Sequence, residues 1–96
     1  MKKLLVILTS ILLSKLAFAQ QANRQYEQAL ELFNKNELAT AQIAAKNSLQ
    51  QNPNFLPARI LLGKILLKQG QIGSAEKEYT VALTLNADIE NVIIPL

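Results

Sequence analysis

The stretch that decides the fold spans residues 57–88 and reads PARILLGKILLKQGQIGSAEKEYTVALTLNAD. Apolar residues recur at helical spacing over 60–66, which predicts a helix with Pro57 in its first turn, where proline is tolerated. Gly70 is expected to end this helix, because glycine readily adopts the left-handed backbone of a helix C-terminus. A second helix is predicted over 72–85, with small and apolar residues three or four positions apart. The stretch is therefore predicted to be a helical hairpin.

A second, less regular copy of this hairpin precedes it. A shift of thirty-four residues places small residues on small ones and apolar residues on apolar ones. The aligned pairs are Ala29 with Gly63, Leu32 with Leu66, Asn36 with Gly70, Ala41 with Ala75, Ala45 with Tyr79, Ser48 with Ala82, and Leu49 with Leu83. We expect helices over 22–34 and 37–50, with Asn36 as the N-cap of the second and Pro53 behind its end. The prediction is an all-α chain of four helices joined by short loops, in which Ala41 and Ala75 occupy matching places.

The second copy resembles the tetratricopeptide repeat (TPR) at its signature places, which are Leu62-Gly63, Ala75, Tyr79 and Ala82. The first copy keeps Ala29, Leu32, Ala41 and Pro53, and departs from the pattern at Gln25, Gln28 and Ala45. The resemblance implies an α-solenoid with a TPR-like repeat over 20–55, a TPR repeat over 56–88, and the start of a third repeat or a capping helix over 89–96. It also implies that the first helix of each repeat lines a groove that receives a peptide or another protein.

A narrower resemblance covers Pro57 to Leu96, where LLGKILLKQGQIGSAEKEY is followed by NADIENVIIPL. This part is similar to the opening repeats of large TPR lipoproteins of the PEP-CTERM and exosortase systems of exopolysaccharide-producing bacteria. The cysteine that carries the lipid in that family is missing here, and the chain stops where those proteins continue. The resemblance implies a role in assembling an envelope or exopolysaccharide-export complex. The alternative is that the chain is a shortened form of a longer repeat protein, whose open repeat end would favour self-association.

Residues 1–19 are predicted to be a signal peptide. Lys2 and Lys3 form a positive start, 4–13 is apolar, and Ala17-Phe18-Ala19 offers small residues for cleavage after Ala19. Export to the periplasm of a bacterial envelope follows. The alternative is an uncleaved helix that tethers a structural or anchoring protein to the membrane. A spanning helix needs about 20 apolar residues, and Ser14 and Lys15 interrupt the run early.

Composition removes several classes of function. The chain has a net charge of +3, but three of its ten basic residues lie in the predicted signal peptide, and seven basic residues remain against seven acidic ones. We therefore expect no nucleic-acid partner. Cysteine and histidine are both absent, so thiolate or imidazole nucleophiles and the usual zinc sites are excluded. We expect no enzymatic activity, metal or cofactor, and interpret Glu27 with Glu31 and Glu76 with Glu78 as solvated surface.

The TPR alignment nominates eight groove residues in four pairs: Tyr26 with Ile60, Leu30 with Lys64, Phe33 with Leu67, and Asn34 with Lys68. One interpretation is that Tyr26 and Phe33 anchor apolar side chains of a partner while Lys64 and Lys68 attract acidic groups. The other is that the aromatic residues belong to the core and the lysines are solvated. Some TPR proteins bind a C-terminal carboxylate through a set of lysine and asparagine residues in the groove. This chain has Tyr26, Leu30 and Ile60 at those positions, so we do not expect it to bind a C-terminal carboxylate.

Overall fold

The computed structural model describes the backbone of residues 2–93 and the side chains of Leu13 and of residues 16–86. The chain forms four helices, which are α1 (Lys2–Asn34), α2 (Leu38–Gln51), α3 (Leu56–Lys68) and α4 (Ile72–Ile93). The described residues contain no strand. The predicted all-α fold is thus confirmed.

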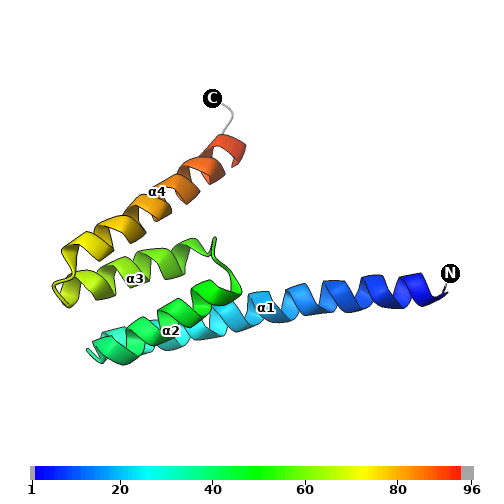
Figure 1. Ribbon diagram of the computed structural model, residues 1–96, viewed down its shortest axis with the longest axis horizontal. Helices are drawn as coiled ribbons and strands as arrows, with labels where there is room; N and C mark the ends of the chain where they lie inside the picture. The colour runs from blue at the N-terminus through cyan, green and yellow to red at the C-terminus, as the bar shows by residue number, and fades with distance from the viewer. Residues whose placement is uncertain (1, 94–96) are drawn as a thin grey trace.

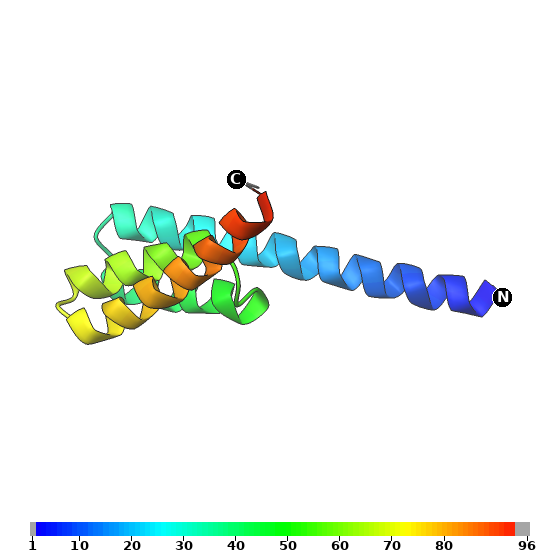
Figure 2. The same cartoon turned by 90° about the horizontal axis from the view of Figure 1, so that it is seen from above.

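Consecutive helices run in opposite directions, so α1 and α3 share one direction and α2 and α4 share the other (Figure 1). Helix α3 lies at the centre, packed against each of the other three helices. Helix α4 contacts α3 alone among the described elements and diverges from the remaining helices. The N-terminal half of α1 projects beyond the other helices, as Figure 2 shows from above.

Small residues are among the most buried of the core. Ala29, Ala41, Ala45, Ala58 and Ala75 all have no exposed surface. Larger side chains from α3 fill the space between the two hairpins, and the most buried are Leu61, Leu62, Ile65 and Leu66. Because α3 is buried on most of its surface, its apolar residues extend around the helix rather than along one stripe.

The turns after α1 and α3 are two copies of one structure. Asn36 and Gly70 both have left-handed backbone, with φ of 63° and 80°. Asn36 N–H donates to Phe33 O at 2.9 Å and Glu37 N–H to Leu32 O at 2.9 Å. The same pair of bonds recurs thirty-four residues later, to Leu67 O at 3.0 Å and to Leu66 O at 2.9 Å. Each turn is therefore a Schellman C-cap.

This turn corrects one prediction. Asn36 is not the N-cap of α2, since Glu37 precedes that helix and Asn36 lies in the turn behind α1. Asparagine tolerates the left-handed conformation better than other residues with a side chain, which explains why it stands where the second copy has glycine. Ala41 and Ala75 do occupy matching places, because each is the fourth residue of its helix and has no exposed surface.

Two helix boundaries differ from those predicted. Helix α4 continues without interruption to Ile93, beyond the end predicted at residue 85, so residues 89–93 belong to α4. Asparagine and aspartate weaken a helix only modestly, and no glycine or proline interrupts the described part of α4 after Gly73. Residues 94–96 of the predicted cap lie outside the described part. Helix α1 begins at Lys2 instead of residue 22, and passes through the predicted cleavage site.

Candidate protein-binding groove

The nominated groove residues form two rows on neighbouring helices. Tyr26, Leu30 and Phe33 follow one side of α1, and Ile60, Lys64 and Leu67 follow the equivalent side of α3, because residues four and seven positions apart share a helix face. Helices α1 and α3 contact each other and run in the same direction. The two rows therefore lie side by side rather than on separate faces.

Three of these residues meet at one cavity. Tyr26, Ile60 and Lys64 line a space of about 260 Å³, together with Leu56, Pro57 and Leu61. Lys64 is exposed, whereas Tyr26 and Ile60 are half-buried. The cavity is thus lined mainly by apolar side chains, with exposed Lys64 as its charged lining residue.

Tyr26 is held by a residue that the sequence did not nominate. Its ring centroid lies 5.5 Å from that of Phe55, with the two planes inclined at 60°. Tilted ring pairs at this separation are attractive because the edge of one ring meets the face of the other. Phe55 directly precedes α3, so the loop between the hairpins fixes the Tyr26 ring. No local pattern in the sequence signals this contact, because it depends on how α1 lies against the loop before α3.

Phe33 and Lys68 contact each other. Lys68 Nζ lies 4.9 Å from the Phe33 ring centroid, within the range of a cation–π interaction. Phe33 is half-buried and packs against the buried core. Leu30 and Leu67 are 37% and 46% exposed, and Asn34 is exposed. The two rows therefore differ along their length. At one end Tyr26 lines the cavity, and at the other end, called the far end below, Lys68 covers Phe33.

A second cavity, of about 440 Å³, lies between α3 and α4. Its lining residues are Leu56, Ile60, Tyr79, Ala82, Leu83 and Asn86. Only Ile60 of this set was nominated from the sequence. The alignment of Leu83 on Leu49 gave no signal for this cavity, because the two residues are identical and differ only in burial, at 71% and 8% exposed.

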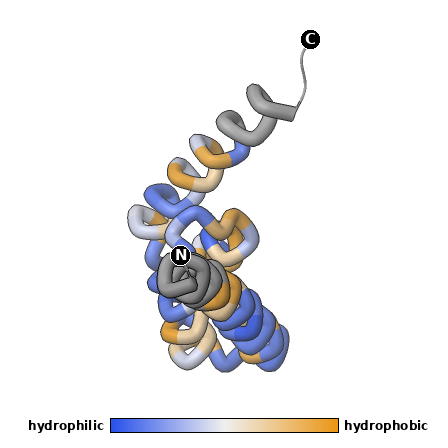
Figure 3. Tube along the Cα trace, turned by 90° about the vertical axis from the view of Figure 1, so that its right-hand side faces the viewer, coloured by the Kyte–Doolittle hydropathy of each residue, from blue (hydrophilic) through white to orange (hydrophobic). Residues whose placement is uncertain are grey.

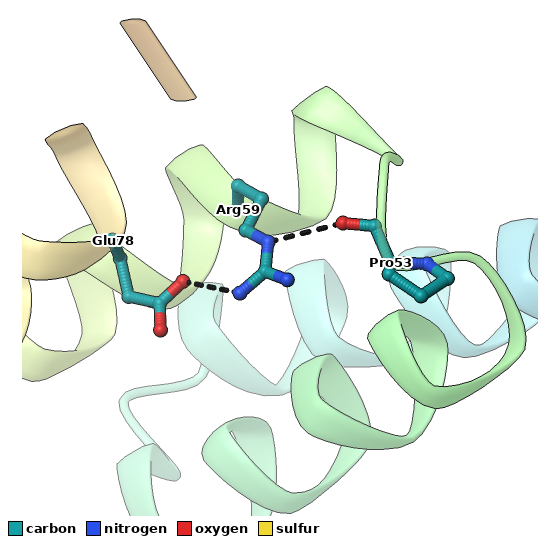
Figure 4. A network of polar contacts seen from close by, with 3 residues as sticks. All are labelled: Pro53, Arg59 and Glu78. Atoms are coloured by element: carbon teal, nitrogen blue, oxygen red, sulfur yellow. Dashed lines mark hydrogen bonds and ion pairs between the residues drawn. The ribbon is translucent and has the colours of Figure 1, made fainter. Parts of the chain in front are cut away.

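Arg59 joins the loop after α2 to helix α4 (Figure 4). Its Nε donates to Pro53 O at 3.2 Å, and its Nη1 donates to Glu78 Oε2 at 2.9 Å. The Arg59 and Glu78 side chains are only 21% and 20% exposed. Glu78 is therefore an ion-pair partner, and the interpretation of Glu78 as ordinary solvated surface is wrong.

Glu31 pairs with Lys35 at 3.2 Å on the exposed side of α1. No group of three or more carboxylates is placed to hold a metal ion within the described residues. None of the helices in the part of the chain that the structure describes has the length and apolar character required to cross a membrane.

Comparison with protein-family models, with curated proteins and with solved structures found no match for the chain.

Proposed function

We propose that this protein is an exported interaction module of the TPR type, which binds a peptide segment of another protein along the face shared by α1 and α3. The supporting observation is the cavity lined by Tyr26, Ile60 and Lys64, which joins both helices at one open site. The repeated turns at Asn36 and Gly70 support the assignment of two equivalent hairpins. On this proposal the chain acts by binding, without enzymatic activity or cofactor.

The chemistry of the cavity defines the ligand. Half-buried Tyr26 and Ile60 favour an apolar side chain, because burying it removes apolar surface from water. Lys64 at the edge favours an acidic group next to it. We therefore propose a peptide in which an aliphatic or aromatic residue stands beside aspartate or glutamate. The far end contributes less, since Lys68 already covers Phe33.

Export is supported by the burial along α1. Every described side chain from Leu13 to Gln21 is exposed, including Leu13 at 66%, Leu16 at 57% and Phe18 at 53%. Among the described side chains the first buried residue is Ala22, at 1%, and its carbonyl accepts a hydrogen bond of 2.6 Å from Ser48 Oγ. Cleavage after Ala19 would therefore remove exposed residues and leave the packed part of α1. The resemblance to exopolysaccharide-associated TPR lipoproteins favours a partner in an envelope or export complex.

Selection from a random peptide library tests the ligand. We expect the wild-type chain to enrich peptides with an apolar residue beside an acidic one. Lys64→Glu should shift the selected residue from acidic to basic, because the charge at the cavity edge is reversed. Lys46→Glu is the matched control, as Lys46 is exposed on α2 away from this cavity. Peptides without acidic residues, or an unchanged selection by folded Lys64→Glu, would refute the groove assignment.

A second candidate is a tethered structural protein that keeps its N-terminal segment. The observation in its favour is the unbroken helix from Lys2 to Asn34, which has no turn at Ala19. Intact-mass measurement on the protein recovered from a bacterial envelope fraction separates the two candidates. A chain that begins at Gln20 supports the exported module, and a chain that retains residues 1–19 supports the tether.

A further inference from the structure

Two glutamines follow the cleavage site that is predicted after Ala19. They are Gln20 and Gln21, so cleavage after Ala19, and equally a cut one residue later, makes glutamine the first residue of the chain. An N-terminal glutamine is chemically distinct from an internal one, because its free α-amino group can close a lactam ring with its own side-chain amide. The exported chain therefore begins with a reactive residue.

The structure leaves this residue accessible. Hydrophilic residues predominate in α1 directly behind Ala19 (Figure 3), and Gln20 and Gln21 are both exposed. Among the described side chains the first buried one is Ala22, whose carbonyl accepts the hydrogen bond from Ser48 Oγ. Before cleavage residue 20 lies inside α1, and its nitrogen is a peptide nitrogen that does not act as a nucleophile. Ring closure thus becomes possible only when the preceding segment is removed.

The charges around the new N-terminus favour the reactive form of the amine. The N-terminus of a helix carries a partial positive charge. Arg24 lies one turn behind Gln20, and the side chains of a helix lean toward its N-terminus. The chain has no acidic residue before Glu27, and α2, which packs against α1, has none at all. An α-ammonium group is therefore disfavoured here, and the neutral amine that replaces it is the nucleophile.

We propose that Gln20 of the exported protein is converted to pyroglutamate. The neutral α-amino nitrogen attacks Cδ of the Gln20 side chain, and a bond between N and Cδ forms. The bond between Cδ and Nε2 breaks, and Nε2 leaves as ammonia with the proton that the amine loses. The reaction needs no oxidant or second reactant. The product is an uncharged lactam that retains the Gln20 carbonyl, through which the first residue of a helix joins the backbone hydrogen bonds.

Cyclisation rests on the export part of the proposed function, and it is independent of peptide binding. Its consequence is protection of the packed end of α1. An aminopeptidase that starts at a free Gln20 removes two exposed residues and then reaches Ala22, which is held by Ser48. A lactam offers no primary amine to such an enzyme, so the cyclised chain keeps the turn that carries this hydrogen bond.

Mass spectrometry of the protein recovered from a bacterial envelope fraction tests the proposal. The free amines of the intact protein are dimethylated before digestion, because a labelled amine can no longer cyclise during handling. Trypsin then releases the N-terminal peptide, which ends at Arg24. We expect this peptide to begin at residue 20, to carry no label, and to be lighter than its sequence requires by one molecule of ammonia.

The other results separate this proposal from the export proposal. A peptide that begins at Gln20 and carries the label shows cleavage without cyclisation, which overturns the proposed modification and leaves export intact. A chain that retains residues 1–19 contradicts both proposals.

Gln20→Asn and Gln21→Asn are the matched variants. Both positions are exposed, and both variants lose the same methylene group. The amine of an N-terminal asparagine would have to close a smaller, strained ring, so Gln20→Asn should carry the label, whereas Gln21→Asn should remain unlabelled like the wild type. An aminopeptidase should remove the first residues of Gln20→Asn and leave Gln21→Asn intact. Equal labelling or equal trimming of the two variants would contradict cyclisation at Gln20.

Discussion

Gly63 of α3 lies directly beneath the ring of Tyr79 in α4. A Cβ atom on Gly63 would lie 2.9 Å from Tyr79 Cζ and 3.0 Å from both Cε atoms. The equivalent residues of the first hairpin are Ala29 and Ala45, and both are fully buried. The two hairpins therefore fill the same place with different residues, glycine and tyrosine in one and two alanines in the other.

This exchange of volume predicts a reversal of sign in a double-mutant cycle. Gly63→Ala should stabilise the chain when Tyr79 is replaced by alanine, by up to about 1 kcal/mol, because alanine is the better helix former. With Tyr79 present the same change should be destabilising, since the new methyl group displaces the ring. Urea unfolding of the four chains measures the coupling free energy, which we expect to be about 1 kcal/mol or more. If the effects of Gly63→Ala and Tyr79→Ala on the free energy of unfolding were additive, the Tyr79 ring would move away from the new methyl group at no cost.

Two glycines close together in sequence should respond to alanine in opposite ways. Gly70 has φ of 80°, where a Cβ atom is unfavourable, so Gly70→Ala should lower the free energy of unfolding by about 1 kcal/mol or more. Gly73 lies in α4, and the place that an added methyl group would take is open space, so Gly73→Ala should raise the free energy of unfolding by about 0.5–1 kcal/mol. Thermal unfolding of both variants checks the prediction. Destabilisation by both would mean that the turn does not end at residue 71.

Replacing Arg59 should loosen α4 from the remainder of the fold. Arg59→Ala removes hydrogen bonds to both Pro53 O and Glu78, and we expect a loss of about 1–2 kcal/mol because the pair is largely shielded from water. Lys35→Ala, which removes the exposed pair with Glu31, is the control and should change stability by less than about 0.5 kcal/mol. Chemical denaturation at low and high salt measures both. If Arg59→Ala and Lys35→Ala lowered the free energy of unfolding equally, shielding from water would not strengthen the Arg59–Glu78 pair.

Ala75→Leu should destabilise the chain by about 1–3 kcal/mol, because Ala75 has no exposed surface and lies where α4 meets the core. Ala39→Leu is the matched control, since Ala39 is exposed on α2. The free energy of unfolding of each variant is the measurement. A neutral Ala75→Leu would mean that the close helix crossing is placed at the wrong residue.

Much of the fold could be predicted from the sequence because its signals are local. The spacing of apolar residues over 60–66, the proline at 57 and the glycine at 70 indicated where α3 begins and ends. The thirty-four-residue alignment paired Asn36 with Gly70, and both have left-handed backbone, but only Gly70 was predicted to adopt it, whereas Asn36 was predicted to be an N-cap. The end of α4 could not be predicted in this way, because asparagine and aspartate at 86–88 are compatible with both a turn and a helix.

The candidate site was predictable only in outline. Periodicity placed Tyr26 and Ile60 on equivalent helix faces, and the packing of α1 beside α3 then brought them to one cavity. Nothing local indicated that Phe55 would support Tyr26, or that Lys68 would cover Phe33. Such contacts depend on the angle and separation of helices, which are set by all the side chains between them.

The sequence by itself determined the course of α2 and α3 and the left-handed turn at Gly70, since each depends on backbone preferences and apolar spacing within a few residues. Only the tertiary structure decided which equivalent residues are covered. Leu49 and Leu83 occupy the same position in their hairpins, and they differ because α3 packs over the first hairpin while no described helix packs over the second. Burial is a property of the neighbours that a residue acquires on folding, and identical local patterns therefore end in different environments.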